Sequence, residues 1–133
     1  MLKQYPRTVK LVFKNYPLSS HKFAKKAAAA ALAAGRQGKF WEFHDELFKI
    51  YRVINDKRIN EIARMLGLDE SQFETDRQDP SILKKIESDS KEGRSIGVTG
   101  IPTIFMNGKR VKNRNIKSLK DMIEREQKKA ADK

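Results

Sequence analysis

The sequence predicts an α/β domain in which one strand is followed by a long helical segment, a hairpin and a final helix. Three observations lead to this prediction. Residues 9–14 are rich in β-branched and apolar side chains, as strands are. Residues 20–96 repeat apolar side chains at helical three-four spacing, and residues 103–112 contain an Asn-Gly pair, the strongest short hairpin signal. A chain of 133 residues suits one hydrophobic core, so we expect a single domain over residues 1–133.

The predicted strand at 9–14, Val-Lys-Leu-Val-Phe-Lys, stops at a turn signal formed by residues 15–17. The next segment carries a long alanine series, whose small side chains let a helix lie close to its neighbours. Ser19 or Ser20 can cap the start of this helix, and Gly35 can take the left-handed conformation at its end.

After Gly38 the spacing predicts a helix with a broad, buried aromatic face. Its apolar positions are Phe40, Trp41, His44, Leu47, Phe48 and Tyr51. His44 shares that face, so we expect a core histidine with a satisfied N–H rather than a general base. His21 lies near a helix start, and we expect it to face solvent.

Four later helices have recognisable starts. Their predicted caps are Asn55 or Asp56, Asp69, Asp79 (followed by Pro80 at the first helical position) and Asn115. The inward residues are Ile59, Ile62, Ala63 and Leu66 in the first, Phe73 in the second, Ile82, Ile86 and Ile96 in the third, and Ile116, Leu119, Met122 and Ile123 in the last. Strands at 103–106 and 109–112 flank the hairpin turn, and we expect the tail to fray after Gln127.

Composition excludes several classes of function. No apolar run approaches the roughly 20 residues that span a bilayer. The chain has no cysteine, so it holds no disulfide, thiolate metal site or thiol chemistry of its own. Its two histidines do not form a metal-ligand set, and we find no phosphate loop, nucleophile elbow or paired catalytic carboxylates. We therefore expect no catalytic residue, no metal site and no cofactor.

The segment VKLVFKNYPLSSHKFAKKAAAAALAAGRQGKFWEFHDELFKIY, followed at the expected distance by GRSIGVTGIPTIFMNGKRV, resembles the DsbA-like family of thioredoxin-fold thiol-disulfide oxidoreductases. The resemblance covers nearly the whole chain, and the order and spacing of its parts carry it. It implies an α/β, thioredoxin-like fold in which residues 20–96 form a helical insertion. Residues 97–127 would then carry the substrate loop, the hairpin and the C-terminal helix.

In that family the corresponding loop carries a cis-proline beside the active-site cysteines, so the resemblance implies that the Ile101-Pro102 bond is cis. The alternative is a trans proline at the first residue of a strand. A cis bond turns the chain and exposes the backbone of the preceding residue to strand addition by a peptide. The resemblance assigns substrate binding to Gly100, Ile101, Pro102 and Thr103, with unfolded or disulfide-bearing polypeptides as the partners.

Family members begin with a strand and a helix that carry Cys-x-x-Cys, and this chain has neither the unit nor the thiols. Thiol-disulfide exchange requires a thiolate, so the chain as given cannot catalyse it. In the thioredoxin fold the missing strand lies between the strand at 9–14 and the hairpin, which leaves two unpaired edges. We expect that the two pieces close up directly, or that a homo-oligomer such as a strand-swapped dimer completes the sheet.

We therefore predict the C-terminal portion of a DsbA-like oxidoreductase or disulfide isomerase, truncated or mis-started, that keeps the peptide-binding loop but is redox-inactive. Two alternatives stay open. One is a cysteine-free thioredoxin-like domain that binds peptides. The other is a basic nucleic-acid-binding protein, because the net charge is +12 and Lys109, Arg110, Lys112, Arg114 and the lysines of the last helix form a candidate basic patch. The resemblance implies a periplasmic or other extracytoplasmic location, although the first residues contain no secretion signal.

Overall fold

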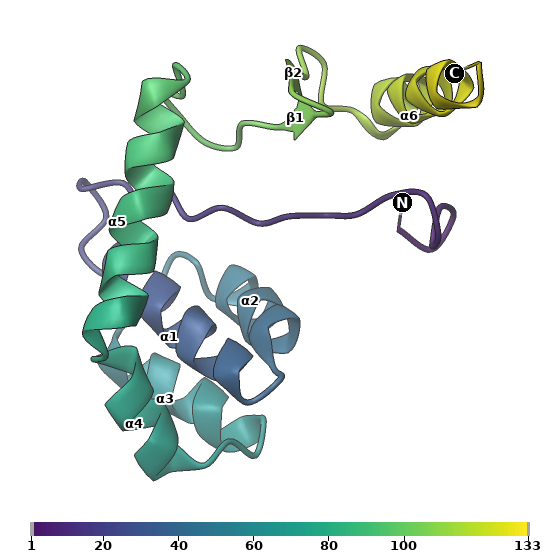
Figure 1. Ribbon diagram of the computed structural model, residues 1–133. Coiled ribbons are helices and arrows are strands. Elements are labelled where there is room, and N and C mark those ends of the chain that lie inside the picture. Colours follow the sequence, from purple (N-terminus) through teal and green to yellow (C-terminus); the bar gives the residue numbers. More distant parts are fainter. Residues whose placement is uncertain (1, 133) are drawn as a thin grey trace. The chain divides into compact units, whose positions relative to one another are not determined.

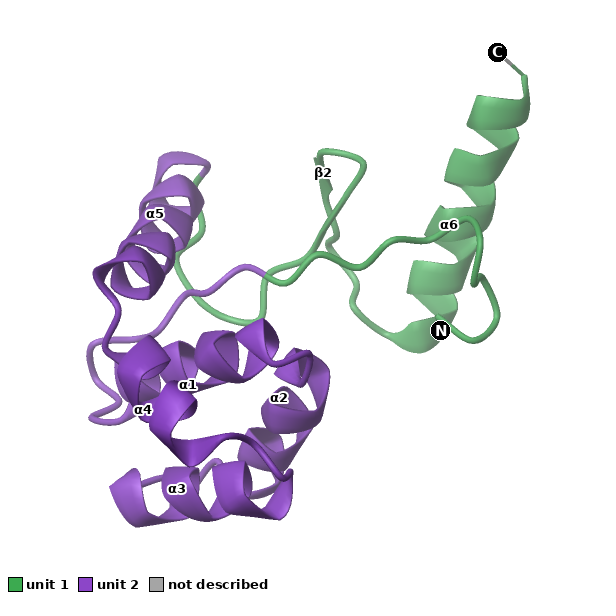
Figure 2. Ribbon diagram, turned by 60° about the horizontal axis from the view of Figure 1, so that its bottom comes forward, with its two compact units in different colours: residues 1–13, 97–133 green, residues 14–96 purple. Residues whose placement is uncertain are grey.

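The computed structural model describes residues 2–132 (Figure 1). Its elements are α1 (Ala24–Arg36), α2 (Phe40–Lys49), α3 (Asp56–Met65), α4 (Glu70–Arg77), α5 (Pro80–Ser95), β1 (Phe105–Met106), β2 (Lys109–Arg110) and α6 (Ile116–Ala131). The chain divides into two compact units, shown in separate colours in Figure 2. The helical unit comprises residues 14–96, and the terminal unit comprises residues 1–13 and 97–133. The expectation of a single domain stays a prediction.

The alanine-rich helix α1 forms the centre of the helical unit. It contacts α2, α3, α4 and α5, and most of its alanines are buried: Ala27, Ala29, Ala30, Ala31, Ala33 and Ala34. Because an alanine side chain is a single methyl group, neighbouring helices can approach its backbone closely. The largest fully buried side chains around it are Phe43, Phe73, Ile59 and Ile86. The rings of Phe43 and Phe73 lie 5.6 Å apart between centroids, which joins α2 to α4 in one core.

Four predicted helix caps are confirmed. Side-chain oxygens of Asn55, Asp69, Asp79 and Asn115 accept backbone N–H groups of Arg58, Gln72, Ser81 and Ser118 at 2.8 to 2.9 Å. Pro80 occupies the start of α5, as expected. These bonds satisfy donors that a helix leaves unpaired in its first turn, so local sequence determines where these four helices begin.

The predicted bounds of α1 are wrong at both ends. Ser19 and Ser20 do not cap it, because successive turns precede the regular helix, which begins at Ala24 without a side-chain cap. Gly35 lies inside the helix, and the left-handed residue is Gly38, with φ at +75°. The backbone N–H of Lys39 donates to the carbonyl of Ala34 across this turn, which extends the helix end beyond the predicted glycine.

The predicted aromatic face of α2 is confirmed for Leu47 and for Phe40, which packs against the core, and is wrong for Trp41, Phe48 and Tyr51. Phe43 and Leu47 are buried, whereas Trp41 is 41% exposed and Phe48 and Tyr51 are each 62% exposed. At 3.6 residues per turn, Trp41 and Phe48 lie about 140° to 160° around the axis from Phe43. A ten-residue helix turns one side to the core, and Phe43 takes the place that the spacing assigned to its neighbours.

His44 is not a core histidine, although its side chain is only 20% exposed. Its ring lies 4.5 Å from the ring of Phe48 and 5.2 Å from that of Trp41, between centroids, in a cluster of aromatic residues at the surface. His21 is exposed, as expected. Ile96 and Ile116, which were expected to face inward, are 54% and 59% exposed because each lies at a helix end beyond the buried stripe.

In the terminal unit, the hairpin is confirmed but shorter than predicted. Phe105 pairs with Arg110 and Met106 with Lys109 in antiparallel register. The turn residues Asn107 and Gly108 have φ of 48° and 79°, the left-handed values that a tight hairpin turn requires. Outside this two-residue ladder, a single bond from the N–H of Val111 to the carbonyl of Ile104, at 2.8 Å, continues the pairing.

The last helix, α6, contacts the first residues of the chain within the terminal unit. Leu119 and Ile123 are buried on its inner face, as predicted, and the helix continues to Ala131 rather than fraying after Gln127. The hydroxyl of Tyr5 donates to Glu124 at 3.3 Å, and the Gln127 amide donates to the Thr8 hydroxyl at 2.6 Å. Figure 1 shows the chain running from these contacts into an extended segment.

The strand predicted at 9–14 does not form. The segment is extended, but among the described residues Lys10, Leu11 and Val12 make no backbone hydrogen bond. A strand is defined by its ladder, and no other described segment pairs with this one, so β propensity alone yields an extended coil. Leu11 and Val12 are 55% and 59% exposed.

None of the helices in the described part of the chain combines the length and the apolar character that a membrane span requires.

Candidate peptide-binding surface

The four residues assigned to substrate binding lie together in an exposed loop between α5 and β1. Gly97 starts the loop in the left-handed region, with φ at +85°, and the Ile101-Pro102 bond is cis, in agreement with the resemblance. Ile101 is 55% exposed, and Pro102 is exposed beside it. The hydroxyl of Thr103 donates to the carbonyl of Gly100 at 2.7 Å, which closes the loop across the proline.

Two arginines that the sequence placed in a basic patch instead contact this loop directly. Arg114 donates from Nη1 to the carbonyl of Pro102, and Arg110 donates from Nη1 to the carbonyl of Gly97 at 3.5 Å. Both side chains reach the loop because the hairpin folds residues 109–114 back alongside it. Sequence spacing alone gave no sign of these contacts, since they depend on the hairpin register.

No segment that the structure describes pairs with the edge of β1 that faces away from β2. In an antiparallel ladder, hydrogen-bonded and non-hydrogen-bonded pairs alternate. The bond between Val111 and Ile104 makes theirs a hydrogen-bonded pair, so Phe105 opposite Arg110 belongs to a non-hydrogen-bonded pair. The N–H and C=O of Phe105 therefore point outward, and its side chain is 38% exposed. Such an edge can accept an added strand.

In the helical unit, the chain that follows the extended segment is held by a buried carboxylate. Asp89 on α5 is 3% exposed, and its Oδ2 accepts both the backbone N–H and the side-chain amide of Asn15 at 3.0 Å. Its Oδ1 accepts a hydrogen bond from Lys85 Nζ at 2.7 Å, and the Nζ of Lys14 lies 4.0 Å from the same oxygen. Burial raises the pKa of Asp89, but the bonds from Lys85 and Asn15 outweigh it and hold the pKa below its usual value.

Comparison with known proteins identifies the family. The family model for the DSBA-like thioredoxin domain matches residues 2–124. The chain belongs to the DsbA-like thioredoxin family. Its fold matches that of a thioredoxin-like oxidoreductase from Silicibacter pomeroyi with a TM-score of 0.76 and 28% identity, over 89% of this chain and 68% of that one. The thioredoxin-like α/β fold expected from the sequence is confirmed, with a mostly helical content and a small sheet.

Relatives of two kinds share this DsbA-like sequence. A probable disulfide bond formation protein D of Bacillus anthracis is 29% identical over 91% of this chain and 59% of its own length. A Na(+)/H(+) antiporter NhaA of Salinispora tropica is 35% identical over 77% of this chain and 16% of its own length. The chain thus spans just over half of the first relative and a small part of the second.

The DsbA-like chain does not carry the reactive group of a thiol-disulfide oxidoreductase. It contains no cysteine, and no other side chain can replace a thiolate in disulfide exchange. The loop and the hairpin present an exposed apolar side chain at Ile101, a strand edge at Phe105, and two guanidinium groups that donate to the loop.

Proposed function

We propose that this chain is the peptide-binding portion of a DsbA-like thiol-disulfide oxidoreductase. It binds an extended polypeptide at Gly100, Ile101, Pro102 and Thr103, and the cysteines that exchange with a substrate disulfide belong to residues outside this sequence. The observation that carries the proposal is the apolar side chain of Ile101, 55% exposed in the loop that leads into β1, whose outer edge no described segment pairs with. An extended peptide can use both features, because its backbone pairs with the edge of β1 while its side chains contact Ile101.

The absence of cysteine favours a second candidate, a domain that binds peptides without redox chemistry. Both candidates predict the same binding surface, and they differ in whether a Cys-x-x-Cys unit is encoded next to it. The DNA sequence upstream of the Met1 codon distinguishes them. An in-frame strand and Cys-x-x-Cys supports the oxidoreductase, and a stop codon with no such unit supports the binder. An extracytoplasmic location, which the family resemblance implies, is part of the first candidate.

A binding assay tests the shared surface. A fluorescein-labelled, uncharged peptide of alternating valine and serine is titrated with the 133-residue chain, and its anisotropy is followed. Ile101→Ser should weaken binding about tenfold or more, since burying an isoleucine side chain is worth about 1.5 to 3 kcal/mol. Leu83→Ser, which alters an exposed aliphatic side chain on α5, should leave binding unchanged. Equal affinity of all three proteins would overturn the assignment.

The unpaired extended segment leads to a proposal about assembly. Lys10, Leu11 and Val12 present unbonded backbone groups and exposed apolar side chains within the described residues. We propose that a second copy completes the sheet in the absence of peptide, because strand pairing satisfies these groups. Sedimentation should show a dimer that the peptide dissociates. A monomer at all concentrations would contradict this.

A further inference from the structure

Much of the net positive charge of the chain lies in the terminal unit, which carries the candidate peptide-binding surface. Residues 97–120 contain six lysines and arginines and no aspartate or glutamate, and residues 2–13 contain three and none. The acidic residues of the terminal unit begin at Asp121 and lie in α6 and after it. There, Glu126 pairs with Lys109 at 2.8 Å and with Lys129 at 3.7 Å. The other cations of 97–120 have no carboxylate partner among the described residues.

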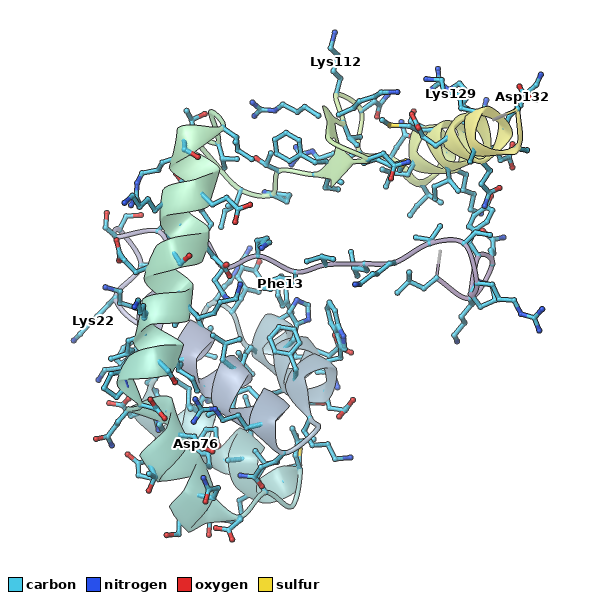
Figure 3. All side chains as sticks on the ribbon, viewed as in Figure 1. Phe13, Lys22, Asp76, Lys112, Lys129 and Asp132 are labelled. Carbon is cyan, nitrogen blue, oxygen red and sulfur yellow. The ribbon has the colours of Figure 1, made fainter. Side chains whose placement is uncertain are left out.

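Two of these unpaired cations lie against the loop itself. Arg110 and Arg114 each use one donor on a loop carbonyl, and both are exposed. A guanidinium has five N–H donors in a planar fork that matches a carboxylate, so most of the donors of each arginine remain available. Lys112, between them in sequence, projects from the hairpin into solvent (Figure 3). The loop is thus bordered by cations on the hairpin side.

We propose that this surface selects acidic extended peptides, in which a central apolar residue contacts Ile101 and flanking carboxylates bind Arg110 and Arg114. The inference rests on the proposed peptide-binding function and adds the class of peptide. The strand edge at Phe105 favours a polypeptide over a nucleic acid, since a peptide backbone supplies alternating donors and acceptors at strand spacing. A positive surface without internal acidic partners attracts carboxylates and repels lysine-rich segments.

The test compares two labelled peptides that differ only in charge. Both alternate valine with a polar residue, and the polar positions next to the centre are glutamate in one and glutamine in the other. The full 133-residue chain should bind the glutamate peptide about tenfold more tightly at 50 mM salt, since each exposed carboxylate-cation pair contributes a factor of about two to five. Raising the salt to 500 mM should reduce this preference to about twofold or less.

Substitutions test whether the preference for the glutamate peptide arises from Arg110 and Arg114. Replacing both Arg110 and Arg114 by Gln should abolish the preference for glutamate, so that the variant binds the two peptides with affinities within about twofold of each other. The matched control replaces Arg52 and Arg58 of the helical unit by Gln, which removes the same charge and should keep the preference. Arg114→Lys keeps the charge and loses the planar fork, so it should retain part of the preference.

The outcomes separate this inference from the function on which it rests. If both peptides bind equally and Ile101→Ser weakens both, the peptide site stands and acidic selection is overturned. If neither peptide depends on Ile101, the proposed function itself fails. If a single-stranded oligonucleotide of equal charge competes with the glutamate peptide at equal concentration and 150 mM salt, the surface recognises polyanions in general, and acidic-peptide selection is overturned in favour of nucleic-acid binding.

Discussion

Replacement of Asp89 by asparagine tests how the chain is anchored in the helical unit. The buried carboxylate accepts three hydrogen bonds, two from Asn15 and one from Lys85. An asparagine keeps one oxygen that can accept, but its NH₂ group replaces the other oxygen and faces a donor from Asn15 or Lys85 with which it cannot bond. The negative charge that attracts Lys85 is also lost. A hydrogen bond to a charged group contributes about 1.5 to 3 kcal/mol, so Asp89→Asn should lower the free energy of unfolding by about 2 to 3 kcal/mol at pH 7.

The loss of unfolding free energy caused by Asp89→Asn should depend on pH. The pKa of Asp89 is lower in the folded chain than its usual value, so the unfolded chain binds a proton more readily. The stabilisation by the carboxylate is present above the unfolded pKa, about 3.9, and is lost as the pH falls through the folded pKa. The difference between Asp89→Asn and the parent chain should therefore shrink as the pH is lowered from 5 to 3.

Urea unfolding followed by circular dichroism at 222 nm measures both effects. The matched control is Glu87→Gln on the same helix, where the glutamate is 63% exposed and lies 3.6 Å from Arg94. An exposed pair of this kind contributes about 0 to 1 kcal/mol. If Asp89→Asn costs no more than Glu87→Gln, or if its cost is the same at pH 3 as at pH 7, the buried carboxylate does not anchor Asn15.

Three further outcomes are expected. Phe43→Ala should lower the free energy of unfolding by about 3 to 5 kcal/mol, and Phe48→Ala by less than about 1, because only Phe43 is fully buried; equal losses in urea unfolding would contradict the packing of α2. Asp79 caps α5 and its pKa is lowered to about 2 by bonds from Ser81 and Arg36, so Asp79→Ala should lower the free energy of unfolding at pH 7, and by less as the pH falls from 4 toward 2. A cost in thermal unfolding that is independent of pH would refute this. The purified chain should reduce insulin no faster than buffer, since it holds no thiol, and any faster turnover would contradict the role proposed for outside cysteines.

Local signals in the sequence were sufficient where one residue satisfies a neighbour along the chain. Asn55, Asp69, Asp79 and Asn115 each bond to an N–H two or three residues away, so a helix start can be read without knowledge of the fold. The hairpin turn at Asn107-Gly108 is local in the same sense. The family resemblance rested on the order of such signals, and the match to residues 2–124 confirms it.

Burial was harder to predict, because a helical period does not say which side meets the core. On α2, the choice between the side with Phe43 and the side with Trp41 and Phe48 depends on how α2 packs against α1 and α3. The extended segment 9–14 fails as a strand for a related reason. Its side chains favour a sheet, but pairing needs a second segment, and the described part of the chain supplies none.

The sequence by itself determined the family, the starts of α3, α4, α5 and α6, the hairpin turn and the impossibility of thiol chemistry, because each follows from residue identity or short-range bonding. The tertiary structure decided what surrounds the loop. Only folding brings Arg110 and Arg114 onto the carbonyls of Gly97 and Pro102, and only the hairpin register turns the backbone of Phe105 outward. Contacts between residues distant in sequence depend on chain geometry, and that geometry is set by the sum of many weak interactions rather than by any local pattern.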